Sequence, residues 1–122
     1  MAAPPLILFS LAVNAAVAGT MGTCLLAPAL TPPALDLPAV YGPDTPARRV
    51  LACLYLSITA TSVAALAHAP WRLPVARVLF PLQIAYKVAT AAVVDLANPV
   101  PQWNLAIAAL HTVALVKATR GV

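Results

Sequence analysis

The sequence predicts an all-α integral membrane protein, a bundle of four transmembrane helices with short loops and one proline-rich loop. Of its 122 residues, 62% are hydrophobic and only 8% are charged, and the mean hydropathy is +0.92. Soluble domains are about 45–50% apolar and about 25% charged, so this chain lacks the polar surface that a water-facing fold needs. Disorder is also excluded, because it requires low hydrophobicity and high charge.

Prolines bound four apolar stretches, each close to the roughly 20 residues that a membrane-spanning helix needs. A proline in the first turn of a helix costs no backbone hydrogen bond, whereas Pro81, inside the third stretch, predicts a kink or the local loss of one backbone hydrogen bond. One domain is expected to cover residues 1–122, with helices at about 5–27, 46–67, 74–96 and 101–117.

The connections between these helices are expected to differ in kind. Residues 28–46 hold six of the thirteen prolines, so we expect the loop at 28–45 to be an extended, ordered surface segment rather than a helix. The other two connections are tight turns with Trp71, Arg72 and Trp103 at their rims. Aromatic and basic side chains at such positions are typical anchors at the membrane–water interface.

Basic residues predict the orientation of the bundle. Four of them fall on the face that holds both termini and two on the opposite face: Arg72, Arg77, Lys117 and Arg120 against Arg48 and Arg49. The positive-inside rule therefore places both termini in the cytoplasm, with a bacterial inner membrane favoured over an organelle membrane. No Lys or Arg precedes the first apolar stretch, which favours a retained helix over a cleaved signal peptide. The net charge of +4 is spread along the chain, so no nucleic-acid partner is expected.

Lys87 is the residue that most needs an explanation, because it lies deep in the third predicted span. A charge there costs at least about 2.5–3.5 kcal/mol unless it is paired, hydrated or neutral. The lysine could extend along its own stem to the headgroups, contact a partner or a lipid, or serve transport together with Gln83 and Tyr55. Asn14, Thr59 and Gln83 form a second polar layer, which favours hydrogen bonds between helices over a substrate path.

His111 lies in the middle of the fourth span and could ligate the magnesium of a chlorophyll-type pigment. A hydrogen-bonded core histidine is the favoured interpretation, and His68 lies at too different a depth to form a haem pair with it. Cys24 and Cys53 match no metal-site spacing and are expected to be buried free thiols. We therefore predict no metal and no cofactor, with a pigment, lipid or quinone contact as an open alternative. Gly19 and Gly22 predict close packing of the first helix.

No pair of nucleophile and base, and no pair of carboxylates, falls within the predicted spans, so an enzyme is not expected. The layout resembles uncharacterised small four-span bacterial membrane proteins, in which a proline-rich loop leads into an arginine-started second helix, here Pro43 to Arg49. Their third helix carries a lysine, here Lys87. The resemblance implies the four-span layout and no activity.

The leading hypothesis for function is a non-catalytic accessory subunit of a larger membrane complex of the respiratory or photosynthetic kind. Its partners would be membrane lipids and other integral-membrane subunits. The alternative is a small homodimeric transporter or channel that uses Lys87, and the third is a pigment- or quinone-binding protein.

Overall fold

The computed structural model describes residues 3–120, and four long helices account for most of them. Each helix has 22 residues: α1 (Pro5–Leu26), α3 (Pro46–Ala67), α4 (Arg72–Val93) and α5 (Pro99–Arg120). At 1.5 Å per residue each is about 33 Å long, close to the roughly 30 Å of a bilayer's hydrocarbon core. The protein is therefore all-α, as predicted, and α4 continues through Pro81.

The ends of the last two helices differ from the sequence expectation. The turn between them is fixed by its own side chains: Asp95 Oδ1 accepts a hydrogen bond from the backbone N of Ala97, and Asn98 Oδ1 accepts one from the backbone N of Val100. The second bond caps α5, with Pro99 in its first turn. As a result α4 ends at Val93 and α5 is longer than expected.

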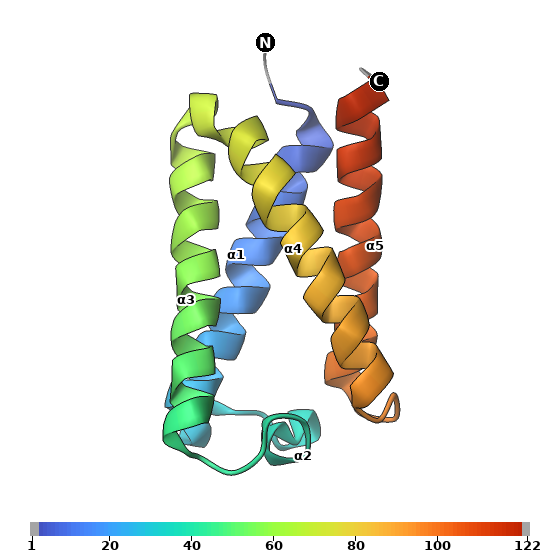
Figure 1. Ribbon diagram of the computed structural model, residues 1–122. Helices are drawn as coiled ribbons and strands as arrows, with labels where there is room; N and C mark the ends of the chain where they lie inside the picture. The colour runs from blue at the N-terminus through green and yellow to red at the C-terminus, as the bar shows by residue number, and fades with distance from the viewer. Residues whose placement is uncertain (1–2, 121–122) are drawn as a thin grey trace.

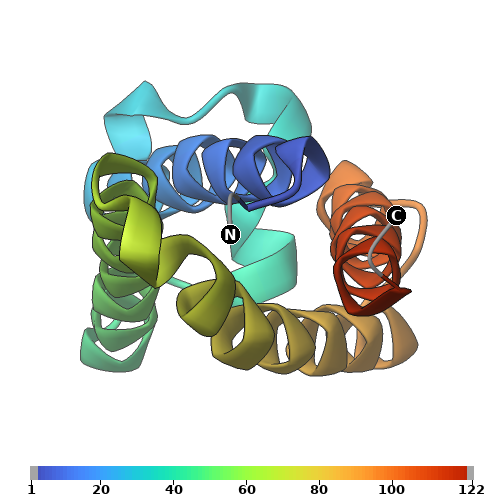
Figure 2. The ribbon, with the colours of Figure 1, turned by 90° about the horizontal axis from the view of Figure 1, so that it is seen from above.

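The four long helices pack as two hairpins, α1 with α3 and α4 with α5 (Figure 1). Seen from above, they follow one another around the bundle in chain order, and α5 returns to lie beside α1 (Figure 2). The first and last described residues lie at the same end, opposite the segment that joins α1 to α3 (Figure 1). An even number of antiparallel helices produces this arrangement.

The proline-rich segment between α1 and α3 is not extended. It contains two 3₁₀ turns, Pro28–Leu30 and Pro33–Leu35, and a short helix α2 (Leu37–Tyr41). Proline suits the first turn of each, where the missing N–H has no partner to lose. The chain then turns at Gly42, whose φ of 75° is a conformation that glycine adopts without strain. The segment folds over one end of the bundle (Figure 1).

Gly22 allows α1 and α3 to pack closely. A Cβ at this position would lie 2.9 Å from Leu56 Cγ and 3.1 Å from the backbone oxygen of Ala52. A Cβ at Gly19 would lie 3.3 Å from Thr59 Cγ2, which is tight but less severe. The close approach expected from these two glycines is therefore present, and α1 meets α3 through them.

Two apolar clusters fill the ends of the bundle. One lies at the end capped by α2 and includes Leu25, Leu37 and Val100. The other lies at the end near the termini and includes Leu11 and Phe80. The buried polar side chains described below lie between these clusters.

The outside of the bundle is apolar over much of its length. Large hydrophobic side chains stand exposed on all four long helices, for example Phe9, Leu54, Leu82 and Val113. By length and composition, two helices, α1 and α3, are apolar enough to cross a membrane. The structure thus shows a helical protein with two candidate membrane spans, whereas the sequence predicts four.

Candidate functional site

Seven polar side chains are buried between the two apolar clusters, and we call them the polar core. None is more than 5% exposed: Ser10, Asn14, Ser62, Gln83, Lys87, Asn104 and His111. They come from all four long helices. Burying polar groups is costly unless they are hydrogen-bonded, so their partners decide what this region can do.

Lys87 forms the most unusual contact of the polar core. Its ammonium Nζ donates a hydrogen bond to Asn104 Oδ1 at 3.1 Å and lies 5.0 Å from the centroid of the Tyr86 ring. With 3% of its surface exposed, Lys87 does not extend along its stem to the headgroups. It also does not reach outward toward a partner. Both partners that the structure gives it are uncharged.

The carboxylates of the chain are all elsewhere. Its three acids, Asp36, Asp44 and Asp95, are exposed and lie in the connecting segments. Asp95, two turns from Lys87 in the sequence, bonds its own turn instead. Within residues 3–120, no carboxylate is therefore placed to balance a positive charge on Lys87.

His111 is held on two sides. Its Nδ1 is hydrogen-bonded to Ser10 Oγ of α1, and its ring stacks on Phe80 of α4 with centroids 4.2 Å apart and planes 4° from parallel. The side chain is fully buried, and its Nε2 has no hydrogen-bond partner among the described residues. This is the hydrogen-bonded core histidine that was favoured, and Phe80 occupies one face of the ring.

The second polar layer is only partly bonded as expected. Asn14 Nδ2 donates to Ser62 Oγ at 3.0 Å and so links α1 to α3. Thr59 Oγ1 donates to the backbone oxygens of Ala15 and Tyr55. Gln83, in contrast, is 1% exposed, and neither its Nε2 nor its Oε1 has a partner among the described residues.

Tyr55 forms a tyrosine cluster with Tyr41 and Tyr86. Its hydroxyl is hydrogen-bonded to that of Tyr41 at 2.9 Å, and its ring meets Tyr86 edge-on at 6.4 Å. Tyr41 lies on α2, so this bond fastens the capping segment to the bundle. Burial raises the pKa of Tyr41 above its usual range, and the neighbouring Tyr55 raises it further.

An apolar groove of about 460 Å³ runs between α3 and α4. Its walls are mostly aliphatic, with Leu54 and Ile58 on one helix and Leu79 and Leu82 on the other. Ser57 and Thr61, four residues apart on α3, also line it. Ser57 Oγ donates to the backbone oxygen of Cys53, so it adds little polarity to the groove.

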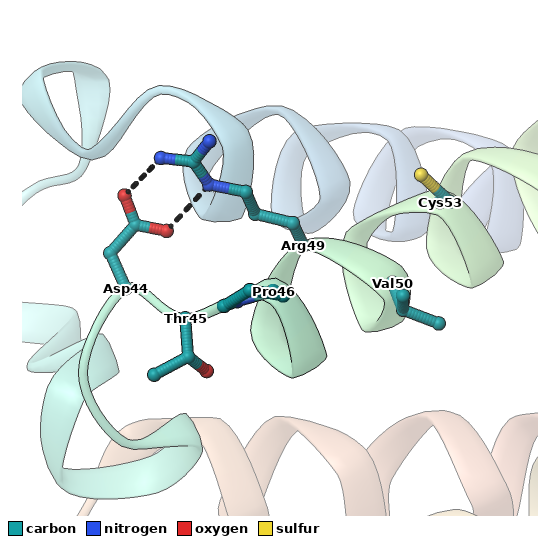
Figure 3. A pocket seen from close by; sticks show the side chains of 6 residues that line it. All are labelled: Asp44, Thr45, Pro46, Arg49, Val50 and Cys53. Carbon is teal, nitrogen blue, oxygen red and sulfur yellow. Dashed lines mark hydrogen bonds and ion pairs between the residues drawn. The ribbon is translucent and has the colours of Figure 1, made fainter.

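A more polar pocket of about 520 Å³ lies at the start of α3 (Figure 3). Arg49 pairs with Asp44 there through two bonds of 3.0 Å, and this hydrogen-bonded guanidinium lowers the pKa of Asp44 below its usual range. Both groups are well exposed, so the pair adds little stability. Cys53, expected to be buried, is exposed at the rim, whereas Cys24 is buried, and both are free.

The three predicted anchors lie at the ends of the bundle. Trp71, in the turn before α4, and Trp103, near the start of α5, are 53% and 62% exposed. Arg72 Nη2 donates to the backbone oxygen of Leu66 at 2.8 Å, so this side chain also caps the last turn of α3.

Sequence reasoning missed Asn104, Ser10 and Ser62, the partners of Lys87, His111 and Asn14. For Asn104 a signal was present. A short turn makes α4 and α5 antiparallel neighbours, and Lys87 and Asn104 lie equally far from it. Serine in a small-residue helix gives no comparable signal, because it packs there as readily as alanine.

Within residues 3–120, no group of three His, Cys, Asp or Glu side chains is placed to hold a metal ion. In comparisons with protein-family models, with curated proteins and with solved structures, nothing matches the chain.

Proposed function

We propose that the chain is a four-span protein of a bacterial inner membrane, with both termini in the cytoplasm. The helices α4 and α5 are less apolar than α1 and α3 because they carry more polar residues. The support for four spans is that four of these polar residues are buried inside the bundle and do not face the lipid. Gln83, Lys87, Asn104 and His111 are all buried inside the bundle. The outward faces of the same helices carry valine and leucine, which suits contact with lipid tails.

In this membrane the protein acts as a non-catalytic subunit that packs against another integral-membrane protein. The observation that carries this proposal is the groove between α3 and α4. Its occupant is a transmembrane helix of the partner, because the groove is apolar and lies along the spans. The small side chains of Ser57 and Thr61 let the backbone of such a helix approach α3 closely.

Co-migration in the native membrane tests this function. The tagged protein, extracted in mild detergent and run on a blue-native gel, is expected to migrate with a larger complex at fixed stoichiometry. Ser57→Trp fills the groove and is expected to release the protein from that complex. Val113→Trp introduces the same side chain at an exposed position on α5 and is expected to leave the complex intact.

Three outcomes would overturn the proposal. Wild-type protein that migrates alone has no partner subunit. Co-migration that survives Ser57→Trp places the partner on another face. A phospholipid retained by wild-type protein and lost from Ser57→Trp, with no protein partner, makes the occupant a lipid.

A small homodimeric transporter or channel that uses Lys87 is the second candidate. The polar core favours it, because a buried ammonium beside an unpartnered Gln83 is unusual in a purely structural bundle. Lys87→Met would abolish transport while leaving assembly unchanged. Pigment binding through His111 is less favoured, because Phe80 stacks on the ring that would have to face a macrocycle.

A further inference from the structure

We propose that the polar core between α4 and α5 binds a small monovalent anion beside Lys87. This goes beyond the proposed packing function, which needs no ligand. Three features of the polar core support the site: the charge of Lys87, the unpartnered groups around it, and the kind of hydrogen bond that those groups can offer.

The first feature is the unbalanced charge. Lys87 is 3% exposed, and it contacts a neutral amide and an aromatic ring. A buried charge is stable only when it is paired or neutralised. The three aspartates are exposed in the connecting segments, so a charged Lys87 has no counter-ion within the described residues and would need one from outside.

The second feature is the position of Gln83. Two side-chain contacts between α4 and α5 bracket this part of the polar core: Lys87 with Asn104, and Phe80 with His111. These contacts lie seven residues apart on each helix, which is two turns or about 10 Å. Gln83 lies between them on α4, one turn from Lys87, and is 1% exposed. Its amide is therefore enclosed between the two contacts.

The third feature is that the unpartnered groups are mainly donors. Gln83 Nε2, Asn104 Nδ2 and His111 Nε2 are buried and without partners among the described residues, beside one unpartnered acceptor, Gln83 Oε1. When the Ser10 hydroxyl donates to His111 Nδ1, the imidazole carries its proton on Nε2. Leaving buried donors unbonded is costly, so an acceptor bound to them stabilises the fold.

These features define the chemistry of the ligand. Ammonium and N–H donors repel a cation, and a neutral molecule would leave the charge of Lys87 unbalanced. One ammonium balances one negative charge, which favours chloride, bromide or nitrate over a multiply charged phosphate or sulfate. The donors that would hold the anion are Lys87, Asn104 and Gln83, and His111 lies two turns away at the far end of the same buried region.

Thermal unfolding of the full-length protein in detergent tests the site. The unfolding midpoint is measured while sodium gluconate is replaced by sodium bromide, chloride or nitrate at constant ionic strength. Binding to the folded state is expected to raise the midpoint saturably by a few degrees, because only the folded protein offers the site. Gluconate is too large to enter it.

Matched variants locate the effect. Lys87→Met removes the charge and Gln83→Leu removes the enclosed amide, and each is expected to abolish the rise. If Lys87→Met fails to fold, Gln83→Leu carries the test alone. Lys117→Met removes the same charge from an exposed position on α5 and is expected to retain the full rise.

Several results would overturn the site. Equal midpoints in gluconate and bromide would mean that the folded protein binds no small anion. A rise that persists in Lys87→Met or in Gln83→Leu would be a general effect of salt. A rise that disappears in Lys117→Met alone would place the anion on the surface.

Discussion

Lys87 and Asn104 lie equally far from the turn between α4 and α5, and their side chains meet, with Nζ donating to Oδ1 at 3.1 Å. Eight residues separate Lys87 from Asp95, and eight separate Leu96 from Asn104. The pair therefore fixes how the two helices of this hairpin are aligned along their axes. It also gives the buried ammonium its direct hydrogen-bond partner in the described chain.

Breaking this pair from either side is expected to destabilise the protein. Asn104→Leu leaves the ammonium without its acceptor, and Lys87→Met leaves the amide oxygen without its donor. Each should lower the free energy of unfolding by about 1.5–3 kcal/mol, the range for hydrogen bonds to charged groups. The double variant should cost less than the sum of the two, because both buried polar groups are then removed.

A double-mutant cycle, with unfolding by dodecyl sulfate in mixed micelles, measures this coupling. Gln102→Leu is the control, since Gln102 is an exposed amide on α5 that bonds only the nearby backbone oxygen of Leu96. Strictly additive losses for Lys87 and Asn104 would show that the contact contributes nothing.

The close approach of α1 and α3 gives the second prediction. In Gly22→Ala the new Cβ would lie 2.9 Å from Leu56 Cγ and 3.1 Å from a backbone oxygen, so the helices must shift. We expect a loss of about 1–3 kcal/mol of unfolding free energy, the usual cost of overpacking. Leu56→Ala in the same chain should recover part of it.

Gly19→Ala is the comparison for this variant. Its Cβ would meet only the side chain of Thr59, at 3.3 Å, and replacing glycine within a helix favours the helical state by about 1 kcal/mol. Its effect should therefore be smaller, measured by the same unfolding experiment. A Gly19→Ala variant less stable than Gly22→Ala would contradict this account of the interface.

The helical layout could be predicted from the sequence because composition and proline positions determine it. Pro46 and the apolar stretch that it opens gave the bounds of α3 correctly. The proline-rich segment was harder, because isolated prolines favour extended chain and short helical turns alike. It folds into 3₁₀ turns and α2 because Leu37 is buried against the bundle and Tyr41 bonds Tyr55, contacts that local sequence does not encode.

The polar core could be predicted only in part. Its members Asn14, Gln83, Lys87 and His111 stand out as polar residues inside apolar stretches, whereas Ser10, Ser62 and Asn104 do not. Which polar group each one meets depends on the rotation of every helix about its axis. The low amphipathicity of such alanine-rich helices leaves that rotation undetermined. The contact between Lys87 and Asn104 therefore emerges only from the structure.

The orientation of the chain gives the third prediction. Four spans with cytoplasmic termini place the segment at 28–45 and the turn near Asn98 outside the cytoplasm, and the turn near Trp71 inside it. Alkaline phosphatase, which is active only outside the cytoplasm, should be active when inserted near residue 44 or 97 and inactive near residue 70. Green fluorescent protein at the C-terminus should fluoresce.

The opposite pattern of activities would reverse the orientation. Activity that changes between residues 44 and 70 but is the same at residues 70 and 97 would limit the protein to two spans, α1 and α3. The amount of each fusion protein is measured as well, so that an inactive reporter is distinguished from a fusion that has been degraded.

The hydrogen bond between Tyr41 and Tyr55 gives the fourth prediction, because it fastens α2 to the bundle. Tyr41→Phe removes one hydroxyl and is expected to cost about 1 kcal/mol of unfolding free energy at neutral pH. Tyr86→Phe is the matched control. The Tyr86 hydroxyl lies near Tyr55 but forms no hydrogen bond as short as the one between Tyr41 and Tyr55, so its removal should cost less than Tyr41→Phe.

The same bond predicts how stability depends on alkaline pH. The pKa of Tyr41 is raised in the folded protein, so the unfolded chain loses this proton first, near pH 10. Above that pH the unfolded state binds fewer protons than the folded state, and stability falls as the pH rises. Below that pH both states keep the Tyr41 proton, so the contribution of Tyr41 to the free energy of unfolding is fully present. Unfolding midpoints measured from pH 8 to 11 should fall less steeply in Tyr41→Phe than in the wild type, and equal slopes would show that Tyr41 ionises normally in the fold.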